Sequence, residues 1–293
     1  MATSLPILNA ETPNDPEPDR TVALGKLEAL QEDLKNRVRE GALVAFSGGM
    51  DSAFLLWVAS QAQAQNGGKV VALTTVSAST PAWDREDAES FTRGLGVEQL
   101  WRESREMLLP EYARNDRDRC YHCKTELFRI AAEVAEERGF RWLLYGYNAS
   151  DHGDDRPGHR AAHESGVLAP LSDAGLTKGE IRLLMREADV PLAGKAASPC
   201  LSSRVMTGLE ITPERLRDIE DLEAILRGAG VRVFRVRVCG DGAGGHFLRV
   251  EVDPGEMEMV LICREELQSV GVSRGYRWVT MDLSGYRTGG GVA

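Results

Sequence analysis

The 293 residues include 35 Lys and Arg against 45 Asp and Glu, so the formal net charge is −10, and 42% of the residues are hydrophobic. A chain of this length and composition can bury a full core, and we expect one large domain and a smaller one. The acidic balance argues against a large nucleic-acid footprint, because such surfaces draw their affinity from clustered Lys and Arg. Five cysteines, an odd number, indicate metal, cluster or thiol chemistry rather than a disulfide framework.

The chain begins with a segment that has no apolar periodicity. Residues 1–20 are rich in Pro, Asp, Glu, Asn and Thr, so we expect a disordered tail there. The first thirty residues lack the basic start and apolar core of a secretory signal, and no apolar run approaches the ~18 residues that span a bilayer. We therefore expect a cytoplasmic protein without a membrane partner. A helix is predicted for residues 21–39, where the leucines recur at helical spacing.

A glycine-rich turn follows the first predicted strand. Residues 42–46 are an apolar run, residues 47–52 read Ser-Gly-Gly-Met-Asp-Ser, and residues 53–59 continue as an apolar helix. This order of strand, turn and helix N-terminus is typical of an anion site, because the first helical N–H groups have no internal partner and the helix dipole favours negative charge. The pattern differs from a Walker loop, which needs Gly-Lys followed by Ser or Thr.

Each polar or small residue of this loop has an expected role. Gly48 and Gly49 let the backbone approach a phosphate, and Ser47 and Ser52 add hydroxyl donors. Asp51 would repel a bound phosphate unless a cation lies between them, so we interpret it as a magnesium ligand. The alternative is an ordinary tight turn in which Asp51 or Ser52 caps the helix.

Further strands and helices alternate after the loop. Strands are predicted for residues 70–77, from residue 98 onwards and from residue 142, with a helix over 82–94 between the first two. Thr177 and Glu180 form a capping box, which predicts a further helix through about residue 188. This alternation predicts an α/β fold with a doubly wound parallel sheet, in which ligands bind at the carboxyl ends of the strands. Ser77 and Gly146 follow two of these strands, and we assign both to nucleotide binding. Asp151, further along the same loop, is a second candidate magnesium ligand; the alternative is a solvated acidic run with its neighbours.

Two cysteine motifs stand out from the rest of the chain. Cys120 and Cys123 form a Cys-x-x-Cys pair directly before a predicted helix over residues 126–138, a placement that suits metal or redox chemistry. The pair could also be incidental, and no second pair follows to complete a zinc ribbon. Cys200 lies in a small, polar, proline-containing loop with Arg204 four residues later, which packing explains poorly; the alternative is a buried structural cysteine. We assign Cys239 and Cys263 to the core.

A second unit is predicted after the Cys200 loop. Thr212 and Pro213 open a helix as cap and first helical residue, and strands over 231–238, 247–252 and 276–283 flank a helix over 253–270. We expect domains over 21–204 and 205–288, the latter a smaller α+β module, and a flexible tail over 289–293. Arg235 and Arg237 share one face of a strand, where they could hold an anionic substrate or be solvated edge residues.

The motifs together resemble those of one enzyme family. The matching stretches are residues 47–52, 119–124, 146–151, 156–158 with Glu164, 200–204, the Arg-Val-Arg and Arg-Val-Glu strands (235–237 and 249–251) and 282–287. In this order, over residues 21–288, they look like LarE-type ATP-dependent sulfur transferases of the PP-loop ATP-pyrophosphatase superfamily, whose fold is adenine nucleotide alpha hydrolase-like. Tyr147 departs from the pattern, since family members commonly have Gly-Thr-Asn there, and the glycine-rich stretch 240–245 is an insertion.

The resemblance implies an activity. Such enzymes adenylate a carboxylate of pyridinium-3,5-biscarboxylic acid mononucleotide and convert it into a thiocarboxylate, in the synthesis of the nickel-pincer nucleotide cofactor. It also implies ATP and Mg²⁺ as cofactors, Arg204 as a ligand of substrate or nucleotide phosphate, a homo-oligomer, and sulfide or a cysteine desulfurase as sulfur source. The chemistry is coherent, because AMP is a good leaving group and converts a poor electrophile into a reactive one.

The three cysteines select among forms of this reaction. Family members with cysteines in the pattern of Cys120, Cys123 and Cys200 resemble enzymes in which a [4Fe-4S] cluster on three thiolates carries the sulfur, and we expect this form. One alternative is a single-turnover reaction in which the residue at the position of Cys200 gives up its own sulfur. A tRNA 2-thiolation enzyme is a second alternative, disfavoured by the charge of −10. An amidating synthetase would not need three cysteines.

Overall fold

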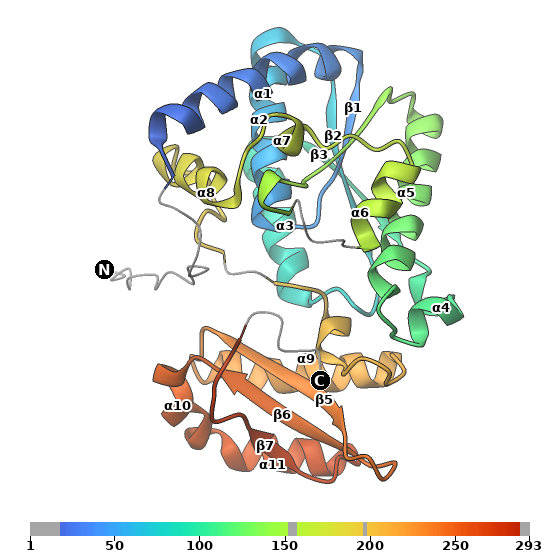
Figure 1. The fold of residues 1–293 in the computed structure, drawn as a ribbon, viewed down its shortest axis with the longest axis vertical. Coiled ribbons are helices and arrows are strands. Elements are labelled where there is room, and N and C mark those ends of the chain that lie inside the picture. Colours follow the sequence, from blue (N-terminus) through green and yellow to red (C-terminus); the bar gives the residue numbers. More distant parts are fainter. Residues whose placement is uncertain (1–17, 152–156, 196–197, 288–293) are drawn as a thin grey trace. The chain divides into compact units, whose positions relative to one another are not determined.

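The computed structural model describes residues 18–151, 157–195 and 198–287 (Figure 1). The chain forms two compact units. Unit 1 comprises Met1–Thr75, Ala82–Glu103 and Lys124–Ser198, and unit 2 comprises Val76–Pro81, Ser104–Cys123 and Pro199–Ala293. Three segments that we expected in the first domain, residues 76–81, 104–123 and 199–204, therefore group with the C-terminal strands. The expected tails fall outside the described residues, apart from residues 18–20.

A four-stranded parallel sheet forms the centre of unit 1. Its strands are β1 (Ala42–Ala45), β2 (Val70–Val76), β3 (Glu98–Glu103) and β4 (Trp142–Tyr145), in the order β3-β2-β1-β4. The register of β1 is parallel to both neighbours, with Ala42 opposite Val70 on β2 and opposite Trp142 on β4. Both neighbours of β1 thus end at the edge of the sheet where the Ser-Gly-Gly turn begins, as expected for a ligand-binding edge.

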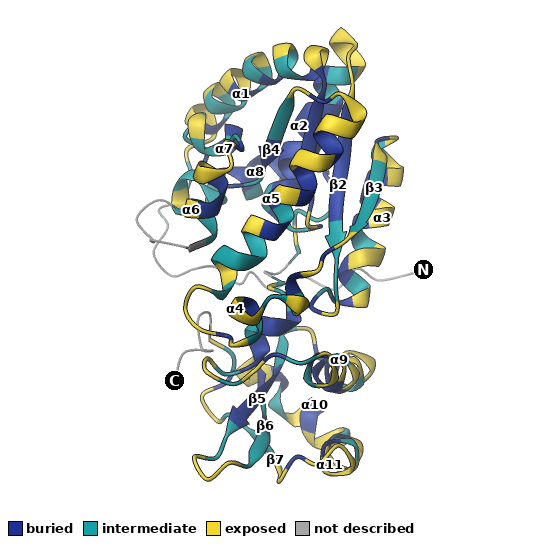
Figure 2. Ribbon diagram, turned by 90° about the vertical axis from the view of Figure 1, so that its right-hand side faces the viewer, coloured by how far each residue is buried: buried dark blue, intermediate teal, exposed yellow. Residues whose placement is uncertain are grey.

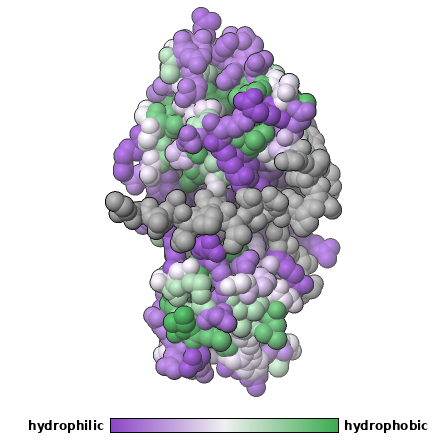
Figure 3. Space-filling model, turned by 90° about the vertical axis from the view of Figure 1, so that its left-hand side faces the viewer, coloured by the Kyte–Doolittle hydropathy of each residue, from purple (hydrophilic) through white to green (hydrophobic). Residues whose placement is uncertain are grey.

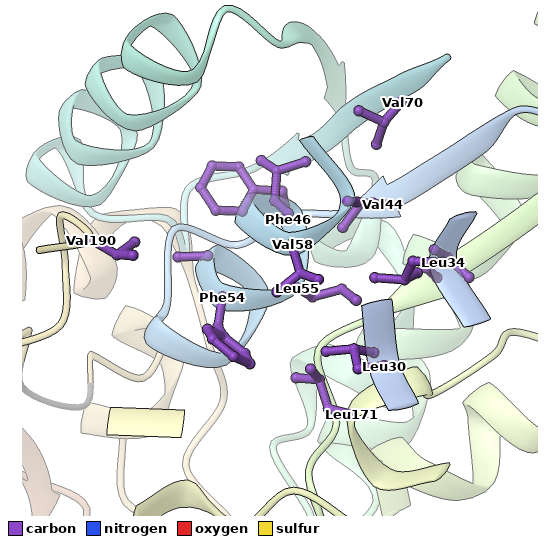
Figure 4. Close-up of a cluster of buried hydrophobic side chains, with 14 of the residues drawn as sticks. Leu30, Leu34, Val44, Phe46, Phe54, Leu55, Val58, Val70, Leu171 and Val190 are labelled. Carbon is purple, nitrogen blue, oxygen red and sulfur yellow. The ribbon is translucent and has the colours of Figure 1, made fainter. Parts of the chain in front are cut away.

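The two faces of this sheet are covered by different helices. Residues of α1 (Arg20–Glu40) and α2 (Met50–Asn66) pack with Val44 of β1 on one face, and Figure 4 shows Leu30, Leu34, Phe54 and Leu55 within this core. Leu43, one residue earlier on β1, packs instead with α5 (Arg119–Arg138). Because successive side chains of a strand point to opposite faces, the continuous apolar runs of β1 and β2 are buried on both sides.

The remaining helices of unit 1 surround the sheet (Figure 1). They are α3 (Ala82–Leu95), α6 (Pro157–Glu164), α7 (Pro170–Asp173) and α8 (Lys178–Glu187), with a 3-10 turn at Ala149–Asp151. The start of α8 is the predicted capping box: Thr177 accepts a hydrogen bond from the backbone of Glu180, whose side chain bonds back to Thr177. None of the helices in the described part of the chain has the length and apolar character needed to cross a membrane.

Unit 2 contains a three-stranded sheet and the Cys200 loop. Strand β5 (Phe234–Gly240) is antiparallel to β6 (His246–Val252), which is parallel to β7 (Val279–Met281). Helix α9 (Pro213–Gly228) buries Leu216, Ile219, Leu222 and Leu226, and Figure 2 shows the buried side of α9 and of the strands in dark blue. The unit also contains three short helical segments, η1 (Glu106–Leu108), α4 (Pro110–Ala113) and η3 (Leu201–Arg204).

The last predicted helix, residues 253–270, is broken in the structure. A 3-10 turn (Pro254–Glu256) precedes α10 (Met257–Ile262) and α11 (Arg264–Ser273), which meet at Cys263. Cys263 is only half-buried, so its assignment to the core was wrong, whereas Cys239 on β5 is buried as predicted. Large apolar side chains of this unit remain exposed, among them Ile262, 81% exposed, and Figure 3 shows apolar surface gathered on the unit.

Candidate functional site

The Ser-Gly-Gly turn presents an uncapped helix terminus. Gly49 is the N-cap of α2, and no side chain of the described residues caps this terminus, so the alternative of a turn capped by Asp51 or Ser52 does not hold. Gly48 has a φ of +73°, a left-handed conformation that favours glycine. Ser52 Oγ donates to the carbonyl of Gly49 at 3.0 Å and lies 3.2 Å from Ser47 Oγ. The turn is therefore rigid, and the first N–H groups of α2 remain available to an anion.

Gly146 lies directly against this helix terminus. A Cβ atom added to Gly146 would stand 2.6 Å from the backbone nitrogen of Ser52 and 2.9 Å from the carbonyl carbon of Asp51. Any other residue would push the end of β4 away from α2. The structure thus places Gly146 beside the Ser-Gly-Gly turn. Glycine is required at this position because the two backbones are too close for a side chain.

Asp51 is partly buried, and one oxygen of its carboxylate is buried and unused. Its Oδ1 has no hydrogen-bond partner among the described residues. Burial raises the pKa of Asp51 above its ordinary value, nearby Lys178 lowers it, Asp151 raises it, and Asn148 and Arg182 lower it. A buried oxygen without a donor fits a ligand that is not part of the protein, and a hard cation is the ligand that carboxylates at such sites prefer.

The neighbourhood of Asp51 contains two cations that the sequence analysis did not single out. Lys178 and Arg182 of α8 both act electrostatically on Asp51, and Lys178 N–H donates to Ser150 Oγ at 3.0 Å. We had considered residues 177–180 only as a capping box. The spacing of two basic residues over one turn of the same helix was the available signal, because residues four apart share a helix face.

Asp151 is held next to this group by an aromatic stack. The ring of Tyr147 lies parallel to that of His159 on α6, with centroids 4.0 Å apart, and Tyr147 Oη donates to the carbonyl of Asp151 at 2.9 Å. Tyr145 Oη and His159 Nδ1 are 2.8 Å apart. Tyr147, which departs from the family pattern, therefore ties the loop after β4 to α6.

The three predicted cysteines all belong to unit 2. Cys120 and Cys123 lie in the first turns of α5, which begins seven residues earlier than the helix we expected at 126, and Cys200 is the residue before η3. All are free thiols; Cys120 is exposed and the other two are partly buried. Burial raises the pKa of Cys200, Arg119 lowers it and Cys120 raises it, so these three side chains lie within electrostatic range of one another.

Arg119 lies between the two cysteine-bearing segments. Its Nη1 donates to the carbonyl of Ser202 at 2.9 Å, and its Nη2 lies 3.8 Å from the sulfur of Cys120. Burial by itself lowers the pKa of Arg119, but the nearby thiols of Cys200 and Cys120 outweigh it, and the pKa is raised overall. The guanidinium is thus a permanent positive charge beside two thiols.

Arg204 is buried and donates hydrogen bonds to backbone carbonyls of the Cys200 loop. It is 1% exposed and pairs with Glu223, with Arg204 Nε donating to Glu223 Oε1 at 3.0 Å. Its Nη1 donates to the carbonyl of Cys200 at 3.0 Å and also to that of Pro199. The structure shows its guanidinium engaged by protein groups, while its expected contact with a phosphate stays a prediction.

Ser77 belongs to unit 2 and is engaged by a buried glutamate. Its hydroxyl and that of Ser79 each donate to Glu106 Oε1 at 2.7 Å, and the carbonyl of Ser79 accepts from the N–H of Leu201 at 2.8 Å. The segment after β2 therefore holds the residue next to Cys200. Nucleotide binding by Ser77 stays a prediction.

Arg237 on β5 is buried rather than solvated. It is 7% exposed and its Nε donates to Glu251 Oε1 at 2.7 Å. The alternative of a solvated edge residue therefore does not hold for Arg237. Arg235 lies over the ring of Tyr286, 5.1 Å from its centroid.

In the described ranges, no set of three or more His, Cys, Asp or Glu side chains is close enough together to hold a single metal ion. Magnesium at phosphate sites needs only one or two carboxylates, because the phosphates and water supply the other ligands. The thiolates around a four-iron cluster bind different iron atoms and so stand apart from one another. The donor types present fit both groups.

Comparison with known proteins gives three similar chains. The uncharacterized protein slr1717 of Synechocystis is 34% identical over 267 residues, which cover 90% of this chain and 97% of the relative. A pyridinium-3,5-bisthiocarboxylic acid mononucleotide synthase of Lactiplantibacillus plantarum is 28% identical over 250 residues, 84% of this chain and 87% of that protein. The uncharacterized protein MJ0830 of Methanocaldococcus jannaschii is 26% identical over 275 residues, 91% and 99% of the two chains. No family model matches the chain.

These relatives extend over nearly the full length of the chain, so the similarity includes both units and both clusters of predicted site residues. The chain therefore belongs to the same family as the Synechocystis protein, a LarE-like family.

Proposed function

We propose that this protein is an ATP-dependent sulfur transferase that converts carboxylates of a pyridinium mononucleotide into thiocarboxylates, in nickel-pincer nucleotide synthesis. Support comes from similarity to a protein named pyridinium-3,5-bisthiocarboxylic acid mononucleotide synthase. The observation that carries the proposal is the gathering of Cys120 and Cys200, from separate parts of the chain, around Arg119 within unit 2. A nucleophilic sulfur is what distinguishes this reaction from other uses of a PP-loop, and we propose a doubly wound PP-loop fold for unit 1.

The first step is activation of the substrate carboxylate. A carboxylate oxygen attacks the α-phosphorus of ATP, the bond to the β-phosphate oxygen breaks, and pyrophosphate leaves. The uncapped N-terminus of α2 would bind the departing pyrophosphate, and Lys178 and Arg182, which act electrostatically on Asp51, would neutralise its charge. Asp51, with its unpartnered Oδ1, would hold Mg²⁺, with Asp151 as a second ligand.

The second step is displacement of AMP. A sulfur nucleophile attacks the acyl carbon, the bond to the AMP oxygen breaks, and a thiocarboxylate forms. Arg119 offers a fixed positive charge beside Cys120 and Cys200, where it favours anionic sulfur and the anionic product. We propose that Cys120, Cys123 and Cys200 hold a [4Fe-4S] cluster; when bound, it would supply the transferred sulfur from an iron that no protein thiolate occupies.

The cluster is tested by anaerobic purification and measurement of iron, acid-labile sulfide and absorbance near ~400 nm. The expected result is about four irons per chain, lost when Cys120, Cys123 and Cys200 are all changed to Ala. Cys263→Ala is the matched control, because Cys263 is also a partly buried free thiol but lies on the α10–α11 junction.

Sulfur transfer is tested separately, by mass spectrometry of the product and of the protein. Multiple turnovers with sulfide as donor, together with AMP and pyrophosphate in equal amounts, support the proposal. Iron-free protein that thiolates substrate once while Cys200 loses about 34 Da would replace the cluster mechanism with sacrifice of the cysteine. Absence of any AMP formation with the pyridinium substrate would refute the function itself.

The remaining expectations follow the same proposal. We propose a cytoplasmic enzyme, in keeping with its five free thiols. We also propose a homo-oligomer, supported by the exposed apolar side chains of unit 2. Sulfide or a cysteine desulfurase would supply the sulfur.

A further inference from the structure

We propose that Asn115 is a positioning residue that, through Arg119, sets the separation of Cys120 and Cys200. The inference rests on the proposed function only for what the two thiols do; the spacing itself can be measured in protein that transfers no sulfur. Asn115 was not among the expected site residues. It lies in the turn between α4 and α5, five residues before Cys120.

Asn115 binds the segment that follows the Cys200 loop. It is fully buried, and the two N–H groups of its Nδ2 are shared among three carbonyls, those of Val205 at 3.2 Å, Met206 at 3.0 Å and Leu209 at 2.9 Å. Its own carbonyl accepts from the N–H of Gly208 at 2.9 Å. A single side chain therefore holds the segment after Cys200 in one conformation.

The other end of the same amide holds Arg119. Asn115 Oδ1 accepts from Arg119 Nη1 at 2.7 Å, and the same Nη1 donates to the carbonyl of Ser202 at 2.9 Å. The second terminal nitrogen of Arg119 lies 3.8 Å from Cys120 Sγ. The hydrogen bonds run from the segment after Cys200, through Asn115 and Arg119, back to the Cys200 loop and across to Cys120.

The residue type fits this position closely. Asn115 has a φ of +56°, a left-handed conformation that Asn tolerates better than most non-glycine residues. Asparagine also offers two donors and one acceptor group on one planar amide, which is what carbonyls on one side and a guanidinium on the other require. Aspartate has the same shape but no N–H to donate, and alanine offers neither group.

These hydrogen bonds fix the position of the Cys200 loop relative to the start of α5, which carries Cys120. Tyr112 Oη, on α4, makes a parallel link to Ser202 Oγ at 2.6 Å, so residues 112–119 contact Ser202 at two points. Arg119 is the first residue of α5, and a shift of its guanidinium moves the Ser202 carbonyl relative to the helix that carries Cys120. Loss of Asn115 should therefore change the distance between the thiols before it changes the fold.

The test is chemical cross-linking of thiols in the full chain, kept reduced and free of iron by a chelator. Dibromobimane becomes fluorescent when it links two thiols that are close together, and peptide mass mapping identifies the pair. The variants are Asn115→Gly, which keeps the left-handed conformation but removes the amide, and Arg119→Met, which keeps length but removes the guanidinium. Arg117→Met is the matched control, because Arg117 is exposed and only two residues away.

We expect the rate of Cys120–Cys200 cross-linking to fall about ten-fold in Asn115→Gly and Arg119→Met, and to be unchanged in Arg117→Met. Single alkylation of Cys263 should stay constant in all variants, which shows that the fold is kept. If Asn115→Gly does not fold, the cross-linking rate of Arg119→Met tests the inference. Wild-type rates of cross-linking in folded Arg119→Met would overturn the inference. Normal cross-linking in a protein without sulfur transfer would refute the proposed function and leave the positioning role standing.

Discussion

The substitution Gly146→Ala tests the close contact between the end of β4 and the Ser-Gly-Gly turn, for which we propose phosphate binding. The added Cβ would stand 2.6 Å from Ser52 N and 2.8 Å from Ser52 Cα, both backbone atoms at the start of α2. Ordinary contact begins near about 3.5 Å, so the two backbones must separate by roughly 0.9 Å. Backbone atoms cannot rotate away as a flexible side chain can, and Gly146 has no positive φ, so the effect is steric alone.

The size of the effect follows from that displacement. Overpacking of this kind typically costs about 1–3 kcal/mol, which lowers Tm by roughly 2–4 °C for each kcal/mol in a domain of this size. An N–H group moved by about 0.9 Å from an ideal distance of about 2.9 Å no longer makes a hydrogen bond. We therefore expect ATP and pyrophosphate to bind at least about ten-fold more weakly, which is the loss of about 1.4 kcal/mol.

Calorimetric titration with ATP and Mg²⁺ measures the affinity, and thermal unfolding measures the stability. Gly25→Ala is the matched control, since Gly25 lies within α1, is exposed, and has no atom within 4 Å of the added Cβ. It should raise stability by about 0.5–1 kcal/mol and leave ATP binding unchanged, because alanine favours helix. Gly146→Ala with wild-type affinity and Tm would show that the contact is not needed for the turn.

Three further substitutions have expected outcomes. Asp51→Asn should abolish Mg²⁺-dependent ATP binding, yet it should raise the Tm of the ligand-free protein at neutral pH by roughly 2–4 °C for each kcal/mol of stability gained. Burial raises the pKa of Asp51 above 3.8, so the folded state binds the proton more tightly than the unfolded state does. The wild type therefore loses stability as the pH rises through the folded pKa, and Asp51→Asn does not. Thermal unfolding between about pH 4 and 8 should show the advantage of Asp51→Asn shrinking towards acid, and an advantage independent of pH would contradict this account. Arg204→Met should cost about 3–5 kcal/mol in urea unfolding, because it leaves Glu223 buried and unpaired, and adding Glu223→Gln should recover part of the loss; equal stability of the single and double variants would count against the pairing. Lys178→Ala should weaken pyrophosphate binding about ten-fold in calorimetry, with exposed Arg186→Ala on the same helix as control, and equal effects of both would mean that only net charge matters.

Local patterns predicted several of the strands and helices of this protein. The runs at 42–46 and 70–77 predicted buried strands, and Thr177 with Glu180 predicted a capping box, because these signals depend on residues close in the sequence. The Ser-Gly-Gly turn was expected to open a helix with free N–H groups, and the structure has Gly49 as an N-cap without a side-chain bond. The prediction of one continuous helix over 253–270 was wrong, because no glycine or proline at Cys263 signals the break there.

Long-range contacts were decided by the tertiary structure alone. Asn115 and Glu223 carry no local signal, yet one holds the segment after Cys200 and the other neutralises Arg204 across 19 positions. From the sequence, Lys178 was predicted only as part of a capping box, and the folded structure places it near Asp51. Short-range periodicity and turn chemistry depend on neighbouring residues, so the sequence by itself determined the buried strands, the uncapped Ser-Gly-Gly turn and the positions of the thiols along the chain. Which buried amide, carboxylate or cation supports each of them depends on segments that meet only when the chain folds, because burying a polar group requires a partner that can come from anywhere in the chain.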